Sequence, residues 1–272
     1  MILSSGSAAA GDVALWWSAA LAAALYAVAS VRGGQLERWA RVAFPLAWVA
    51  HWVVLAVEVL GWGSQQQGAR LGFAPVLSLT VWIVIGVHAV ESRFVPLPAV
   101  RGWLAPVGAM VVLLAAWFPG DVRGFATSAG PLHFILGVGA YGLFGAAVVH
   151  AALLDASETR LRRMRPDAKA GPVMPLLQLE RLTFRFVEVG FAVLSAALAL
   201  GIATASSWRW DHKNLLSILG WTVFAALLAG RRLRGWRGRR ATRWLYAGAL
   251  LLLLAYVGSR FVLEVVLPRS RG

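Results

Sequence analysis

The stretch WRWDHKNLLSILGWTVFAALLAGRRLRGWRGRR, residues 208–240, decides the fold. It begins with a polar cluster rich in tryptophan, continues as an apolar run, and ends in a turn whose charged residues are all arginine. A helix rises 1.5 Å per residue, so about 20 apolar residues cross the roughly 30 Å hydrocarbon core of a bilayer. The stretch therefore predicts a transmembrane helix between a tryptophan-rich interface and an arginine-rich turn.

The composition extends this interpretation to the whole chain of 272 residues, which is 59% hydrophobic and 14% charged. Globular domains carry about a quarter charged residues. The absence of cysteine excludes disulfides and thiolate metal sites. Apolar runs predict an all-α, polytopic membrane helix bundle of about eight transmembrane helices, forming a single integral membrane domain over residues 1–272. The runs are Val13–Val31, Val42–Gly61, Phe73–Ala89, Trp103–Phe118, Leu132–Leu154, Phe186–Ala205, Leu215–Ala229 and Trp244–Leu263.

The positions of the basic residues predict the orientation in the membrane. Most of the 26 Lys and Arg residues lie in alternate loops, above all in the connections 155–185 and 231–243. Cytoplasmic loops of membrane proteins carry an excess of Lys and Arg. We therefore expect these loops to be cytoplasmic and both termini to lie outside. The net charge of +14 follows from the same rule, so we expect no nucleic-acid partner.

Five histidines are the main candidates for chemistry. On this topology His133 begins the fifth span at its outer end, His51 lies near the middle of the second span, and His212 lies in the outer cluster. Ionisable groups within membranes are costly and usually face the bundle interior or a cavity, and neutral imidazole is a common ligand for transition metals. For His88 and His150 we favour the alternative, an interhelical hydrogen bond.

The helix that begins at His133 has a glycine, Gly137, one turn further along the same face, followed by Tyr141 and Phe144. A histidine above a glycine, with aromatic side chains below, would let a flat macrocycle lie against the backbone. The alternative is that the glycines of this helix allow neighbouring helices to pack closely.

The outer cluster suits a large planar ligand that carries carboxylates. The rings of Trp208 and Trp210 could stack on such a ligand, although tryptophan is also enriched at membrane interfaces for other reasons. Asp211 could hydrogen-bond a ligand histidine or cap the helix that follows. Because the chain shows no paired carboxylates, nucleophile constellation or phosphate-binding loop, we expect that it is not an enzyme.

The segment WRWDHKNLLSILGWTVFAALLAGRRLRGWRGRRATRWLYAGALLLLLAYVGSRFVL resembles the C-terminal half of the cytochrome c assembly family of membrane proteins, the CcsA/CcmC-like heme handlers. The resemblance is strongest over residues 131–263, because LHFILGVGAYGLFGAAVVHAALL looks like the family's histidine-led helix. The size is most similar to the short, eight-span branch called YpjD- or HemX-like. The matching residues are Trp208, Trp210, Asp211, Lys213, Ser217, Trp221 and the run Gly235–Arg240.

The resemblance implies a heme-binding chaperone of cytochrome c-type biogenesis, a multi-pass protein of the bacterial inner membrane. Heme b would be held non-covalently near the outer face, with iron ligated by His133 and His51. The predicted depth in the membrane favours His212 as the alternative partner of His133, because both lie near the outer end. The loop with Trp208, Trp210 and Asp211 would lie beside the ring. The implied partners are the lipid bilayer and either cytochrome c assembly proteins or an apocytochrome.

A second hypothesis assigns the function to the basic loops. In this interpretation the protein is a membrane scaffold or regulator, for example of heme synthesis, that does not transfer heme. Its basic loops, residues 155–185 and 231–243, would bind a soluble partner or anionic lipid.

Overall fold

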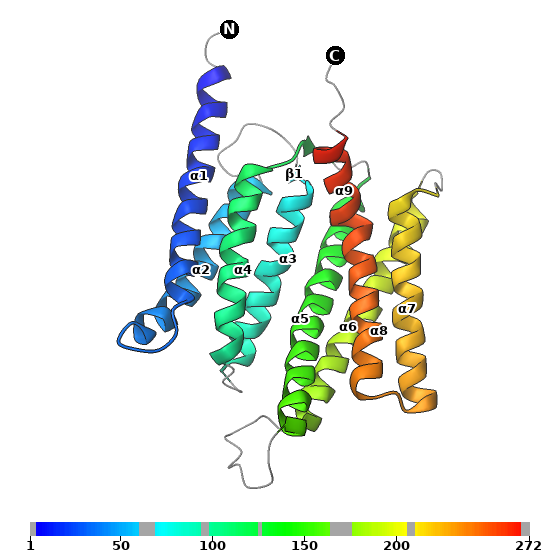
Figure 1. Cartoon of the computed structure of the whole chain (residues 1–272). Helices are drawn as coiled ribbons and strands as arrows, with labels where there is room; N and C mark the ends of the chain where they lie inside the picture. The colour runs from blue at the N-terminus through cyan, green and yellow to red at the C-terminus, as the bar shows by residue number, and fades with distance from the viewer. Residues whose placement is uncertain are drawn as a thin grey trace. The chain divides into compact units, whose positions relative to one another are not determined.

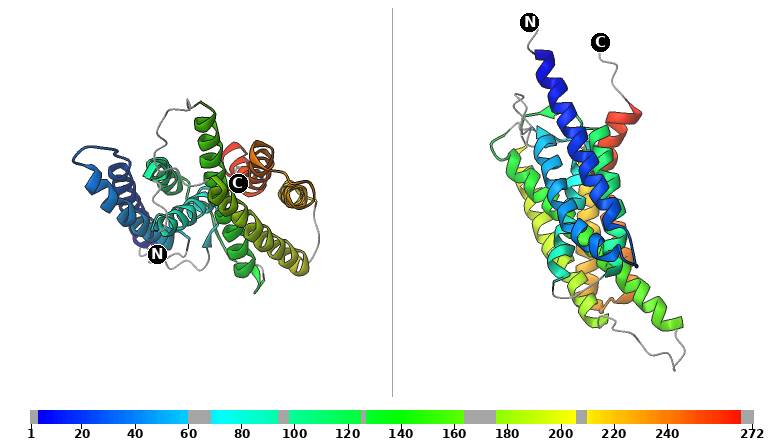
Figure 2. Two further views of the ribbon diagram at one scale, coloured as in Figure 1. Left: turned by 90° about the horizontal axis from the view of Figure 1, so that it is seen from below. Right: turned by 90° about the vertical axis from the view of Figure 1, so that its left-hand side faces the viewer.

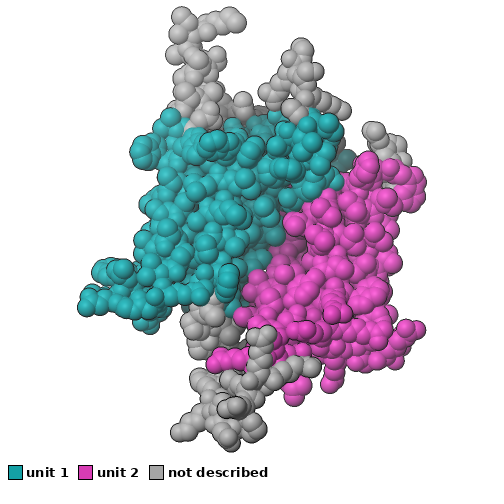
Figure 3. Space-filling model, viewed as in Figure 1, with its two compact units in different colours: residues 1–128, 257–272 teal, residues 129–256 magenta. Residues whose placement is uncertain are grey.

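The computed structural model describes residues 4–59, 69–93, 98–124, 127–163, 176–205 and 210–267. The chain divides into two compact units, coloured separately in Figure 3. Unit 1 contains residues 1–128 and 257–272, and unit 2 contains residues 129–256. The single integral membrane domain expected from the sequence stays a prediction.

Unit 1 is built on four long helices, α1 (Ser4–Ala29), α2 (Glu37–Glu58), α3 (Phe73–Glu91) and α4 (Pro98–Trp117). Helix α1 packs along α2 and α4, and α3 packs along α4 and α2 (Figures 1 and 2). The connections after α2 and α4 meet in two short antiparallel strands, β1 (Ala69–Arg70) and β2 (Val122–Arg123), with Arg70 opposite Val122. The last turns of the chain, α9 (Ser259–Phe261) and the π-helical η2 (Val262–Val266), complete the unit.

Unit 2 contains α5 (Gly130–Arg163), α6 (Leu176–Thr204), α7 (His212–Arg234), α8 (Gly238–Leu253) and the beginning of the π-helical segment η1 (Leu254–Gly258). Helix α5 packs along α6 and α8, while α7 packs mainly along α8 (Figure 1). The turn between α7 and α8 is short, so these two helices are antiparallel neighbours.

Each of the eight predicted apolar runs corresponds to a long helix, which confirms an all-α polytopic membrane bundle. Among the residues that the structure describes, seven helical stretches are long and apolar enough to cross a membrane, and α1 contributes the shorter apolar segment Val13–Ala29. Two helices extend beyond their apolar runs into the predicted connection 155–185, because α5 continues to Arg163 and α6 begins at Leu176. Helix α5 can continue past its apolar run because residues 155–163 contain no glycine or proline.

Local sequence signals determine where α7 begins and ends. The side chain of Asp211 accepts a hydrogen bond from the backbone N–H of Asn214 at 2.8 Å, so it caps the first turn. Gly235 ends the helix in the left-handed conformation, with φ of 64°, and its N–H donates to the carbonyl of Gly230. The capping role of Asp211, one of the two alternatives from the sequence, is thereby observed.

The core of unit 2 is aromatic and depends on glycines in the neighbouring helices. Phe144 of α5 and Phe224 of α7 stack with ring centroids 3.9 Å apart, and both side chains are fully buried. A Cβ atom on Gly248 would approach the Phe224 ring to 2.8 Å, and one on Gly190 would approach Phe144 to 3.2 Å. Small residues therefore let α6 and α8 close on the stacked rings.

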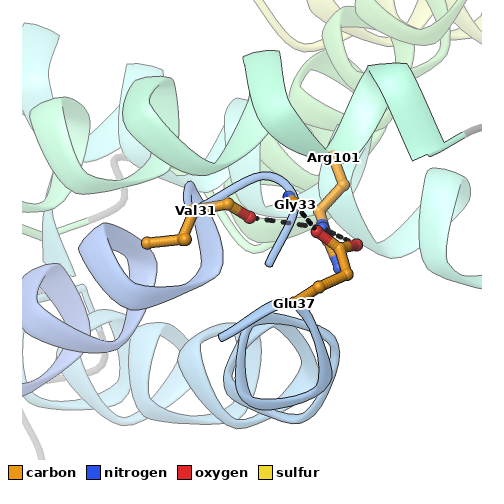
Figure 4. Close-up of polar contacts among 4 residues, drawn as sticks. All are labelled: Val31, Gly33, Glu37 and Arg101. Atoms are coloured by element: carbon orange, nitrogen blue, oxygen red, sulfur yellow. Dashed lines mark hydrogen bonds and ion pairs between the residues drawn. The ribbon is translucent and has the colours of Figure 1, made fainter. Parts of the chain in front are cut away.

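In unit 1 an ion pair between a buried arginine and a half-buried glutamate links the start of α2 to α4 (Figure 4). Arg101 is 8% exposed, and its Nη2 lies 2.5 Å from Oε1 of Glu37. The other Glu37 oxygen accepts from the N–H of Gly33 at 2.9 Å, and Arg101 also reaches the carbonyl of Val31 at 3.5 Å. Such additional hydrogen bonds are what a poorly solvated ion pair needs to offset the loss of water.

Candidate functional site

His51 lies at the centre of a buried hydrogen-bonded chain that joins three helices of unit 1. Its side chain has no exposed surface. The Nδ1 atom lies 3.1 Å from the hydroxyl of Tyr26 on α1, and Nε2 lies 2.8 Å from the hydroxyl of Ser78 on α3. A hydroxyl can donate or accept, so the two partners satisfy the neutral imidazole in either tautomer. Ligation of a metal by His51 would require one of these hydrogen bonds to open.

A pair of tryptophans holds the register of α2 and α3 one turn away from His51. The rings of Trp48 and Trp82 stack at 4.7 Å with an interplanar angle of 5°. Each indole N–H donates to the other residue's backbone carbonyl, at 2.9 and 3.0 Å. The Trp48 ring also lies against Gly86, where a Cβ atom would come within 3.1 Å. This reciprocal contact positions Ser78 opposite His51.

His133 has a different environment at the start of α5. Its half-buried ring lies against α6, with Nδ1 at 2.9 Å from the backbone carbonyl of Ala197. A carbonyl can only accept, so Nδ1 carries the proton, and in the neutral ring Nε2 keeps its lone pair. Gly201 makes room for the ring, because a Cβ atom there would lie 2.9 Å from Cε1. This arrangement is typical of a metal-ligating histidine whose second nitrogen is held by a carbonyl.

The helix face below His133 agrees with the sequence-based hypothesis at one position and differs from it at two. A Cβ atom on Gly137 would meet nothing within 4 Å, so this glycine borders open space. Phe144, however, is buried against Phe224, and the hydroxyl of Tyr141 donates to the carbonyl of Leu252 at 2.5 Å. The expectation that these aromatics lie under a planar ligand is therefore wrong, because their positions are fixed by packing against α7 and α8.

The outer cluster joins His133 at one end of unit 2, where α5 and α7 begin and α6 ends; we call this the outer end. His212 is the first residue of α7 and is exposed, and Trp210 is 75% exposed. Lys213 places its Nζ 5.6 Å from the ring centroid of Tyr256. Trp208 lies outside the described residues.

The structure thus brings His133 and His212 to the same end of one unit, whereas His51 belongs to unit 1. His88 and His150 are buried in the interior of their units, at 5% and 3% exposed, unlike the half-buried His133. The His88 ring meets Phe44 edge-on at 6.2 Å. His150 donates from Nδ1 to the Ala146 carbonyl of its own helix at 2.8 Å.

Comparison with known proteins places these residues in a family context. Residues 39–267 match the family described as Cytochrome C assembly protein. The chain belongs to this family. Because the match covers most of the chain, His51, His133, His212 and the arginine-rich turn all lie within the family region.

Two relatives illustrate the range of this cytochrome c assembly family. The chain is 29% identical over 246 residues to the inner membrane protein YpjD of Escherichia coli (strain K12), which covers 86% of this chain and 90% of YpjD. It is 36% identical over 86 residues to the cytochrome c biogenesis protein CcsA of Prochlorococcus marinus (strain MIT 9303). That alignment covers 30% of this chain and 27% of CcsA. No solved structure matches. The chain is therefore a multi-pass inner membrane protein of a cytochrome c assembly family.

Sequence reasoning identified His51 but missed its partners Tyr26 and Ser78, as well as the Trp48–Trp82 pair. The residues in each contact are 25 to 34 positions apart. The available signal was the occurrence of single polar residues within otherwise apolar runs, which indicates that they pair but does not show with which residue.

The buried chain around His51 predicts the effect of replacing Ser78. In Ser78→Ala one ring nitrogen of His51 loses its partner, which we expect to destabilise the protein by about 1–3 kcal/mol. The thermal unfolding midpoint in detergent measures this loss. Ser217→Ala is the matched control, because Ser217 is half-buried on α7 and its hydroxyl makes no hydrogen bond in the described structure. The midpoint of this variant should stay near that of wild type. Equal midpoints for the two variants would contradict this account of His51.

Proposed function

We propose that this protein binds heme b non-covalently at the outer end of unit 2, where His133 would hold the iron. The observation that carries the proposal is the hydrogen bond from Nδ1 of His133 to the Ala197 carbonyl. It fixes the ring and directs the lone pair to Nε2, as ligating histidines require. The name of the relative CcsA, a cytochrome c biogenesis protein, supports the choice of heme over another metal group.

The surroundings of His133 fit a planar ligand with carboxylate groups. Open space beside Gly137 leaves the helix backbone accessible one turn below the histidine. Lys213 supplies a cation at the same end for a propionate, and the exposed ring of Trp210 offers a stacking surface. Because Asp211 caps α7, its contribution is to hold His212 and Lys213 in the first helical turn.

Two histidines are candidates for a second protein ligand of the iron. His212 is exposed and lies at the outer end of unit 2, so it can approach a heme there without breaking a described contact. His51 is favoured by resemblance to the short branch of the family, but its Nε2 must first leave Ser78. The proposed ligand pairs are thus His133 with His212 and His133 with His51.

The bound heme would supply a redox-active iron, and the chain's own residues would hold and orient it. The protein would act as a chaperone that presents heme to a partner, rather than as an enzyme. Since the chain has no cysteine, thiols for covalent attachment would come from an apocytochrome or from another cytochrome c assembly protein. We expect no nucleic-acid partner.

A hemin titration of five single variants, each histidine replaced by alanine in turn, tests the proposal. We expect wild-type protein in detergent to give a low-spin, six-coordinate absorption spectrum. His133→Ala and one of His51→Ala and His212→Ala should lose it. His88→Ala and His150→Ala are the controls, because both side chains are buried in the interior of their units, and they should keep the spectrum. Gel filtration establishes that each variant is folded.

The same experiment separates the two functional hypotheses. A featureless spectrum for wild-type protein after hemin addition would overturn heme binding and favour a scaffold or regulator that acts through its basic loops. A spectrum that survives His133→Ala would overturn the assignment of the ligand while leaving heme binding in place.

Gly201 predicts an indirect effect on the same site. In Gly201→Ala the new methyl group would press on Cε1 of His133 and move Nδ1 from the Ala197 carbonyl. Loss of such support typically lowers metal affinity by about 10-fold to 100-fold, and we expect hemin affinity to fall within that range. Gly139→Ala is the matched control, because its Cβ would meet only Val193 at 4.0 Å. Equal hemin affinities for both variants would contradict a positioning role for Gly201.

A further inference from the structure

The turn between α7 and α8 carries several arginines. It lies at the end of unit 2 opposite His133 and His212. The ring of Trp236 folds back onto Gly230, where a Cβ atom would come within 2.5 Å, and its backbone N–H donates to the Gly230 carbonyl at 3.2 Å. Arg231 donates to the Trp236 carbonyl at 3.2 Å, and Arg240 stacks over the Trp236 ring at 4.4 Å. These contacts hold the backbone of the turn, so the Cα positions of its exposed arginines are set before any ligand binds.

Of the carboxylates near the turn, Glu180 and Asp155 are occupied by other contacts, and Glu158 lies beside Gly238. Glu180 pairs with Arg231 at 3.1 Å, and Asp155 accepts from both Thr242 and Tyr246. The exposed arginines of the turn have few negatively charged side chains close to them. Within the described part of the chain, the exposed side chains of Arg234, Arg237 and Arg243 have no carboxylate within 4.0 Å.

Apolar side chains are interspersed with these arginines. Leu233, between Arg232 and Arg234, is 83% exposed, and Trp244 is 37% exposed next to Arg243. A soluble acidic partner would match the charge but would offer no reason for an exposed leucine on the same surface. A phospholipid matches both features, because its phosphate meets the guanidinium groups and its acyl chains meet the leucine and tryptophan.

We propose that this surface, formed by Arg234, Arg237 and Arg243 with Leu233 and Trp244, is a binding site for the headgroup of an anionic phospholipid in the cytoplasmic leaflet. All seven basic residues from 231 to 243 are arginine, whose planar fork can bind a phosphate through two hydrogen bonds. The proposal is independent of heme binding. It goes beyond the excess of positive charge that orients a membrane protein, because it assigns the affinity to one rigid turn.

A lipid titration with matched charge variants tests this site. The thermal unfolding midpoint of the detergent-solubilised full chain is followed as dioctanoyl phosphatidylglycerol or dioctanoyl phosphatidylcholine is added, which gives an apparent Kd for each. Arg234→Gln/Arg237→Gln/Arg243→Gln removes three charges from the site. Arg38→Gln/Arg41→Gln/Arg93→Gln removes three exposed charges from unit 1, in connections that the charge distribution also predicts to be cytoplasmic.

We expect the site variant to bind phosphatidylglycerol about tenfold or more weakly, since each arginine near an anionic surface contributes substantially to affinity. The control variant should stay within about twofold of wild type. Arg234→Lys/Arg237→Lys/Arg243→Lys keeps the charge but loses the fork, so it should also bind more weakly, and it serves as the test if the glutamine variant does not fold.

Three results would overturn the proposal: equal loss of affinity in the site and control variants, full retention of affinity in the lysine variant, or equal stabilisation by phosphatidylcholine. Either of the first two results would show that lipid binds through positive charge in general and not through these three arginines. The third would show that the anionic headgroup is not recognised.

Discussion

The hydrocarbon core of a membrane contains no water to hydrogen-bond a polar group, and most of this structure follows from that constraint. Helices satisfy their own backbone, so the chain crosses the membrane only as helices. Each polar side chain within a span must find a partner or face a place where a ligand can serve as one. The Tyr26–His51–Ser78 chain shows the first solution. The second is the one that we propose for His133.

The same constraint distinguishes two histidines that look alike in the sequence. His51 has both ring nitrogens engaged by side chains from two neighbouring helices, α1 and α3, and the Trp48–Trp82 pair holds α2 and α3 in register. His133 has one nitrogen engaged by a backbone carbonyl at the edge of its unit. In His51 both ring nitrogens are already hydrogen-bonded, so neither can bind a metal without losing a partner. In His133 the hydrogen bond at Nδ1 orients the ring and leaves the lone pair of Nε2 for a metal. This difference is the physical reason for ranking His133 first among the proposed heme ligands.

Much of the fold could be predicted from the sequence, because span length, charge distribution and helix caps are local. The apolar runs, the cap at Asp211 and the left-handed turn at Gly235 all belong to this class. The contacts of the site could not be predicted in the same way. Helical periodicity places Gly137, Tyr141 and Phe144 on one face but does not say which neighbour that face meets, and Phe144 proved to pack against Phe224. The role of Trp208 stays a prediction, since it lies outside the described residues.

The central claim, that Nε2 of His133 ligates heme iron, is tested most directly by chemical rescue. His133→Gly leaves a space beside Ala197 and Gly201 that free imidazole can fill. We predict that the hemin-loaded His133→Gly protein lacks the low-spin spectrum of wild type and regains it when imidazole is added, while His150→Gly keeps it throughout. A His133→Gly protein that is folded and shows the wild-type spectrum without imidazole would contradict the account.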